Sequence, residues 1–290
     1  MGCMMGGYLQ LAKPRIGVMI ALTAVTGYLA TVQQGQINWG HIGLLMLAMM
    51  MGSASSSIFN HFYDRDIDRL MTRTATRPFA QRTVARPNFV LWVAASLLVV
   101  GCAIATYVFN PVVAAHLFLG AFVYGVVYTI WLKRRNWLNI VIGGLAGSFA
   151  VLAGAAAVNP EQWLLPMLLA IVLFFWTPSH FWALAIRLKD QYAAAGVPML
   201  PVVAGSVATS KYILINSILL VGSSMLPWFL GELGNIYGVS AALLGAYFLY
   251  KNLQLCRDVN DKNAMSNFFA SMKYLGGLFL AVIMDVHLPL

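Results

Sequence analysis

Residues 41–59 read "HIGLLMLAMMMGSASSSIF" and are followed directly by "NHFYDRDIDRLMTRTATRP" at residues 60–78. The first stretch is an apolar run long enough to cross the ~30 Å hydrocarbon core of a bilayer as a helix. The second stretch places three aspartates and four arginines at the end of that run. An apolar helix that ends in a dense group of charges is typical of an integral membrane protein with a site at the membrane border.

The composition of the whole chain supports the same class. The 290 residues are 60% hydrophobic and only 9% charged, with a mean hydropathy of +0.77. A soluble domain carries roughly 25% charged residues, so this composition excludes a water-soluble globular protein. The net charge of +9 reflects membrane topology in such a chain, and we expect no nucleic-acid partner.

Apolar runs of spanning length recur along the chain. They lie at about 16–33, 41–62, 89–108, 112–132, 138–157, 163–186, 212–231, 235–252 and 268–287. We therefore predict an all-α polytopic bundle of about nine transmembrane helices, embedded in the lipid bilayer as one domain over residues 1–290.

The basic residues segregate between the predicted connections. All 18 lysines and arginines fall before the first span, in even-numbered connections or, like Lys251 and Lys273, in the ends of spans that border such a connection. Basic loops stay on the cytoplasmic side of a membrane. The pattern therefore predicts a cytoplasmic N-terminus and an external C-terminus, with residues 63–88 and 187–211 as long cytoplasmic connections.

The acidic residues of the opening stretch follow a helical spacing. Asn60, Asp64 and Asp68 are each four residues apart, which aligns them along one face of a helix. Like charges at this spacing destabilise a helix, and acids near its C-terminus oppose the helix dipole. A row of oxygen ligands suits a hard divalent cation, so the row predicts a metal site.

Basic residues repeat the same spacing one position further on. Arg65, Arg69, Arg73 and Arg77 form a second row, which suits a phosphate-rich anion if the helix continues. Together the two rows predict a site for a magnesium-bound diphosphate. Asp66 points to another face, and we expect it to pair with Arg69.

These motifs resemble those of a known family. The stretch at 60–78 is similar to the first aspartate-rich motif of the UbiA-type intramembrane prenyltransferases. The resemblance continues through "YTIWLKRRNWLNIVIGGLAG" (128–147) and "FFWTPSHFWALAIRLKDQYAAAGVPMLPVV" (174–203). The last of these resembles the haem-modifying branch of the family.

The resemblance implies roles for individual residues. Asn60, Asp64 and Asp68, together with Asp190, match the catalytic and metal-binding positions. Positions that surround the diphosphate in the family are matched by Arg65, Arg77, Tyr128, Lys133, Arg134 and Lys189. The wider family carries a second Asp-x-x-x-Asp motif after the sixth span, whereas here Ala194 follows Asp190 at that spacing.

The implied reaction is transfer of a farnesyl group from farnesyl diphosphate to a vinyl group of haem b, giving haem O. The resemblance also implies Mg²⁺ or a similar divalent cation and a cytoplasmic-side active site in a UbiA-type bundle. It places the chain in a bacterial cytoplasmic (inner) membrane, with a possible association with a haem A synthase or a terminal oxidase assembly.

The acceptor site is expected along the sixth span. His180 follows Pro178, whose ring disrupts the helix ladder. The imidazole either contacts the haem or hydrogen-bonds a carbonyl that the proline leaves free. Trp176 offers a flat apolar surface to a porphyrin, and Arg187 offers a cation to its propionates.

Two other functions fit parts of the pattern. A prenyltransferase of the same family acting on an aromatic quinone precursor would need the same acidic row. A membrane transporter would also use many helices, but it is expected to place charged groups near the middle of the membrane. In this chain the charges lie at the cytoplasmic border, which favours an enzyme.

Overall fold

The computed structural model describes residues 10–288 of the chain, and within that range it is built from helices without a β-strand. The long helices are α2 (Pro14–Thr31), α3 (Trp39–Tyr63), α4 (Pro87–Ile104), α5 (Pro111–Phe122), α7 (Leu145–Ala156), α8 (Leu164–Arg187), α11 (Ser206–Phe229), α12 (Asn235–Arg257) and α13 (Asp261–His287). Shorter elements are η1 (Ile67–Leu70), η2 (Ala105–Phe109), η3 (Val123–Leu132), α6 (Asn139–Gly143), α9 (Lys189–Ala194) and α10 (Leu200–Val203).

Every apolar run that the sequence predicted is helical. Eight helical segments in residues 10–288 are long and apolar enough to cross a membrane, and α12 is a further long helix outside that set. The last two turns of α12 carry Lys251, Asn252 and Gln254, which lower its hydropathy. The predicted all-α membrane bundle is confirmed.

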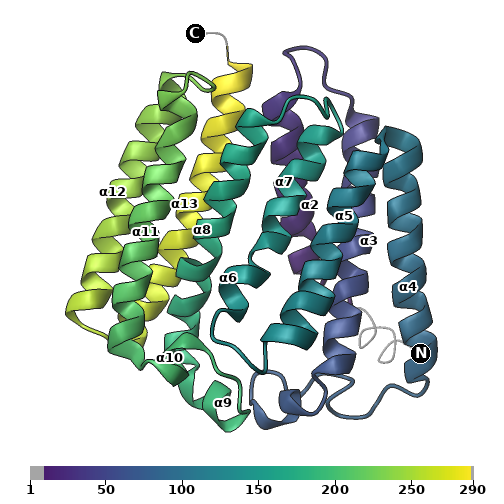
Figure 1. Cartoon of the computed structure of the whole chain (residues 1–290), viewed down its shortest axis with the longest axis vertical. Helices are drawn as coiled ribbons and strands as arrows, with labels where there is room; N and C mark the ends of the chain where they lie inside the picture. The colour runs from purple at the N-terminus through teal and green to yellow at the C-terminus, as the bar shows by residue number, and fades with distance from the viewer. Residues whose placement is uncertain (1–9, 289–290) are drawn as a thin grey trace.

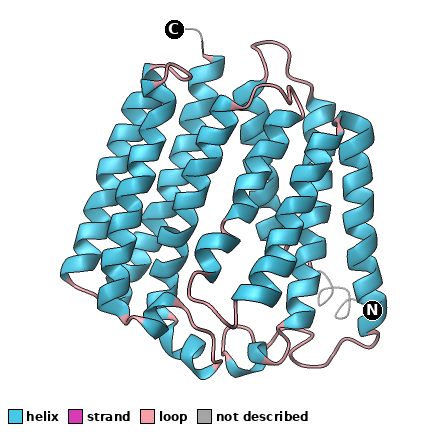
Figure 2. Cartoon of the chain, viewed as in Figure 1, coloured by secondary structure: helices cyan, strands magenta, loops and turns pink. Residues whose placement is uncertain are grey.

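The helices run up and down, so that successive connections alternate between the two ends of the bundle (Figure 1). The two longest connections lie at the same end, where Figure 1 shows α9 and α10 and Figure 2 shows most of the irregular chain.

The start of the last helix was predicted too far along the chain. The ninth span was predicted from residue 268, but α13 begins at Asp261, where the Asn260 side chain accepts a hydrogen bond from the Asn263 backbone N–H.

Helices α2 and α7 cross closely because each has a glycine at the contact. A Cβ atom at Gly154 would lie 1.7 Å from the Ala24 carbonyl oxygen, and one at Gly27 would lie 2.1 Å from the Val151 carbonyl oxygen. No other residue fits at either position. Small residues are the usual means by which membrane helices approach one another, and this contact holds α7 beside the site described below.

Two irregular segments shape the lower half of the bundle. The predicted fifth span breaks at Gly144 into α6 and α7, and there a Cβ on Gly143 would lie 2.9 Å from the Tyr128 ring. The lower part of the fourth span, η3, is a π-helix. Its hydrogen bonds join residues five apart, including the bond from the Lys133 N–H to the Tyr128 carbonyl. This register turns Tyr124, Thr129 and Lys133 toward the end of α3.

Candidate active site at the basic end of the bundle

The predicted acidic row begins at the end of α3. Asn60 and Asp64 are buried, and the Asn60 side-chain N–H group donates to Asp64 Oδ2 at 2.7 Å and to Thr129 Oγ1 at 3.1 Å. Lys133 Nζ also donates to Asp64 Oδ2. Helix α3 ends at Tyr63, so Asp64 is its C-cap residue. The carboxylate thus has a neutral partner from α3, Asn60, and a cationic partner, Lys133, at the end of the π-helix.

Asp68 lies one turn further along the chain, although the α-helix has ended. The Asp68 N–H donates to the Asp64 carbonyl at 2.8 Å, which keeps the two carboxylates in register through the η1 turn. Arg77 Nη1 donates to both Asp68 oxygens, at 3.0 and 2.8 Å. Asp68 is 1% exposed, so this ion pair is shielded from water. The structure therefore brings Asn60, Asp64, Asp68, Lys133 and Arg77 together.

Lys13 belongs to the same cluster and was not predicted. Its Nζ donates to Asn60 Oδ1 at 3.1 Å and to the Tyr124 hydroxyl at 3.2 Å. Its backbone is left-handed, with φ of 46°, which is strained for a residue with a side chain. Burial, followed by the charge of Arg77, lowers the pKa of Lys13 to about 7. Strain and burial together make Lys13 a candidate functional residue.

The predicted row of four arginines does not exist, because the helix that would align them ends at Tyr63. Arg65 is exposed and packs on the Phe62 ring at 4.2 Å, and Arg69 donates to the Ala80 carbonyl. Only Arg77 of this set binds an aspartate of the row. Arg65 therefore lies outside the cluster.

The expected Asp66–Arg69 pair is also wrong. Asp66 binds Arg134 instead, through two hydrogen bonds of 2.7 and 2.6 Å. The bond from Arg134 holds the pKa of Asp66 below its usual value. Arg134 also lies 3.5 Å from Asp64 Oδ1, so it links the exposed Asp66 to the buried row.

The second long connection, which contains α9, contacts the first long connection through Arg73. Arg73 donates its backbone N–H to Gln191 Oε1 at 3.3 Å and its guanidinium to the Tyr192 hydroxyl at 3.2 Å. These contacts hold α9 against the 64–86 connection. Asp190 lies in the first turn of α9 and is exposed, Lys189 precedes it and is half-buried, and Arg187 at the end of α8 is exposed.

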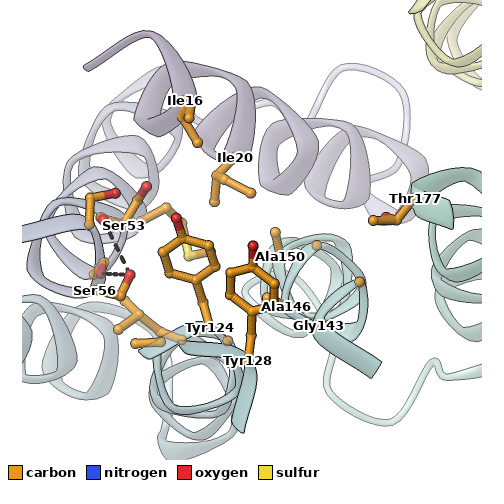
Figure 3. Close-up of a pocket in the computed structure, with 18 of the residues that line it drawn as sticks. Ile16, Ile20, Ser53, Ser56, Tyr124, Tyr128, Gly143, Ala146, Ala150 and Thr177 are labelled. Atoms are coloured by element: carbon orange, nitrogen blue, oxygen red, sulfur yellow. Dashed lines mark hydrogen bonds between the residues drawn. The ribbon is translucent and has the colours of Figure 1, made fainter. Parts of the chain in front are cut away.

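An apolar chamber opens above the charged cluster, inside the bundle. Its volume is about 330 Å³, within the range of small-molecule sites. Figure 3 shows Tyr124 and Tyr128 directed into the space between α2, which carries Ile16 and Ile20, and α7. Tyr124 hydrogen-bonds Lys13, so the phenol joins the chamber to the cations. The arrangement suits a ligand with an anionic head and a hydrocarbon tail.

His180 is held beside this chamber but is not among the residues that line it, whereas Trp176 is. The imidazole is sandwiched between the rings of Trp176 at 4.2 Å and Phe268 at 4.3 Å. Its Nδ1 pairs with the Ser271 hydroxyl at 2.7 Å. The second expectation for His180 was a hydrogen bond to a carbonyl freed by Pro178, and Nδ1 bonds the Ser271 hydroxyl instead.

The acidic residues of the cluster are candidate metal ligands. In residues 10–288, no three His, Cys, Asp or Glu side chains are close enough together to hold a metal ion. Asp64 Oδ1, however, is buried and accepts no hydrogen bond. Arg134 Nη2 faces this oxygen at 3.5 Å, a distance that leaves its hydrogen-bonding capacity unused. The oxygen-rich donor set of Asn60, Asp64 and Asp68 therefore fits a hard divalent cation.

Comparison with known proteins identifies the family. Residues 20–277 match the UbiA prenyltransferase family. The chain is 58% identical to protoheme IX farnesyltransferase 1 of Paramagnetospirillum magneticum, covering 97% of this chain and 98% of that protein. It is 41% identical to protoheme IX farnesyltransferase of Hahella chejuensis, covering 97% and 94%.

Solved structures show the same fold at low sequence identity. A digeranylgeranylglyceryl phosphate synthase superimposes with a TM-score of 0.80 at 19% identity, covering 97% of this chain and 98% of that one. A UbiA homologue from Archaeoglobus fulgidus, bound to DMAPP and Mg²⁺, has a TM-score of 0.73 at 19% identity, covering 95% and 98%. The chain therefore belongs to the UbiA prenyltransferase family.

Proposed function

We propose that the protein transfers the farnesyl group of farnesyl diphosphate to a vinyl group of haem b, which gives haem O. One observation carries the proposal: a cluster of buried carboxylates and cations adjoins an apolar chamber, to which the Lys13–Tyr124 hydrogen bond connects it. The names of the relatives, which span nearly the whole chain, support the haem acceptor.

Asn60, Asp64 and Asp68 would hold Mg²⁺, with Asp190 completing the site from α9. Asp64 Oδ1, which is buried and accepts no hydrogen bond, supports this assignment. A divalent cation bound there would neutralise charge on the departing diphosphate. Lys133 and Arg77 neutralise the carboxylates in the described structure, and a cation held by the aspartates would free both side chains to bind the diphosphate.

The diphosphate is expected among the basic side chains of the cluster. Lys13, Arg77 and Lys133 reach it from three separate segments, and Arg134 lies behind Asp64. These positioned donors stabilise the charge that develops as the allylic C–O bond ionises. Tyr128 lines the chamber just beyond them. Lys189 is a candidate on the neighbouring α9, whereas the exposed Arg65 supports binding only at the rim.

The chamber supplies the conditions for the carbon–carbon bond. Its apolar lining keeps water from the farnesyl cation until the electron-rich vinyl group attacks it. Attack leaves a second cation on the carbon beside the porphyrin. Addition of water at that carbon and loss of a proton leave a hydroxyl group, so the atoms of the reaction balance.

The haem is expected beside Trp176, which lines the chamber, with His180 as its iron ligand. The Nδ1–Ser271 bond and the two stacked rings fix the orientation of the imidazole, which leaves Nε2 for iron. Arg187 at the end of α8 is placed to meet a propionate. The product would leave into the inner membrane, where a haem A synthase or terminal oxidase assembly is a candidate partner.

An acceptor competition tests the proposal. Purified protein receives farnesyl diphosphate, Mg²⁺ and equal amounts of haem b and 4-hydroxybenzoate, and both acceptors are analysed by mass. We expect farnesylated haem alone. Farnesylated 4-hydroxybenzoate would favour the quinone-precursor alternative, and neither product would contradict both enzymatic functions.

A further inference from the structure

We propose that the far end of the chamber sets the length of the prenyl chain, with His116 as the residue that determines this specificity. The inference rests on the proposed function, since it assigns the chamber to the hydrocarbon part of an allylic diphosphate. It adds a prediction that the proposed function does not make: the site selects farnesyl over a longer isoprenoid.

The positions of lining residues along their helices place His116 at the end of the chamber that lies away from the charged cluster. Tyr124 contacts Lys13 at the charged end, and His116 lies eight residues before it on the rod formed by α5 and η3. At 1.5 Å per residue this is about 12 Å of depth. Met49 lines the chamber eleven residues before Asn60 on α3, which corresponds to roughly 16 Å. Both residues therefore lie far from the diphosphate.

The chemistry of His116 makes it an effective end wall. Its ring packs against Phe149 with centroids 6.1 Å apart, and its Nδ1 is buried without a hydrogen-bond partner. The other lining residues at this depth are Met49, Leu117 and Ala150. A tail that reached past His116 would have to displace this ring from its contact with Phe149. A tail that stops short of the imidazole avoids this displacement.

Gly147 is a position where a larger side chain would shorten the same chamber. It lines the cavity from the first turn of α7, and a Cβ atom placed on it would meet nothing within 4 Å. A leucine there extends into the cavity without striking the backbone of a neighbour. The two positions therefore allow the chamber to be lengthened and shortened independently.

The test compares geranyl, farnesyl and geranylgeranyl diphosphate as donors to haem b in wild type, His116→Ala and Gly147→Leu. Phe118→Ala is the matched control, since Phe118 lies on the same helix but is 49% exposed and outside the chamber lining. We expect His116→Ala to raise the geranylgeranyl-to-farnesyl ratio of kcat/KM at least about tenfold. Gly147→Leu should raise the geranyl-to-farnesyl ratio by a similar factor, and Phe118→Ala should change neither.

Unchanged ratios in both chamber variants would overturn the inference and indicate that the tail leaves the chamber for the lipid. Binding of the three unreactive prenyl thiodiphosphates to the same proteins gives a readout that needs no acceptor. If wild type farnesylates no haem, the proposed function fails, yet shifts in analogue affinity of the expected sign would still support the length determinant. Absence of those shifts would contradict it.

Discussion

Asp64→Asn separates the structural from the catalytic role of the buried row. The side chains of Asp64 and Lys133 are 0% and 8% exposed, and the substitution leaves the lysine cation without its counter-charge. Removing one partner of a buried pair costs about 3–5 kcal/mol. Lys133→Met should cost less, because the Asp64 carboxylate keeps the Asn60 amide at 2.7 Å and Arg134 at 3.5 Å.

The double variant Asp64→Asn/Lys133→Met removes both charges, so its free energy of unfolding should return to within about 1–2 kcal/mol of wild type. Its turnover should not return, because the metal-binding carboxylate is lost. Unfolding is measured by denaturant titration in detergent micelles, and turnover by farnesylation of haem b. Asp66→Asn is the matched control: the same change on a 61% exposed side chain should cost about 0–1 kcal/mol. A double variant no more stable than Asp64→Asn alone would refute the reasoning.

Three further predictions concern the cations, the haem and the topology. Because burial lowers the pKa of Lys13 to about 7, the lysine loses its charge as the pH rises through that value. Affinity for pyrophosphate should therefore fall more steeply between about pH 6 and pH 8 in wild type than in Lys13→Arg, whose charge persists; equal slopes would exclude Lys13 from the site. His180→Ala should alter the Soret shift that haem b shows on binding, and an identical shift would remove His180 as the iron ligand. In a background without native cysteines, an impermeant thiol reagent applied from outside should label Gln36→Cys and not Arg135→Cys, whereas the reverse pattern would contradict the cytoplasmic assignment of the site.

Much of the fold follows from local patterns in the sequence. Hydropathy located the apolar helices for a physical reason. A helix that crosses the bilayer pairs its backbone N–H and C=O groups with one another, so it forms from one continuous apolar segment. The spacing of Asn60, Asp64 and Asp68 also gave the core of the site. The η1 turn keeps that spacing although the α-helix has ended, since the Asp68 N–H still bonds the Asp64 carbonyl.

The partners of those residues could not be predicted in the same way. Lys13 is 47 residues from the Asn60 that it binds, and Arg134 is 68 residues from Asp66. Such pairs depend on how helices pack, which no local pattern records. The predicted row of arginines was wrong for a related reason. That prediction assumed that the helix continues beyond Tyr63, where α3 ends. The strained backbone of Lys13 has no signal in the sequence, because a lysine before a proline is not itself unusual.

We propose that the buried carboxylate and cation cluster drives farnesylation of haem b. The most direct measurement is the mass of haem extracted after purified protein is incubated with haem b, farnesyl diphosphate and Mg²⁺ in ¹⁸O-labelled water. We predict haem that has gained a farnesyl group and one labelled hydroxyl group with wild type, and unchanged haem with Asp68→Asn. Unmodified haem with folded wild type, or equal product from Asp68→Asn, would contradict this proposal.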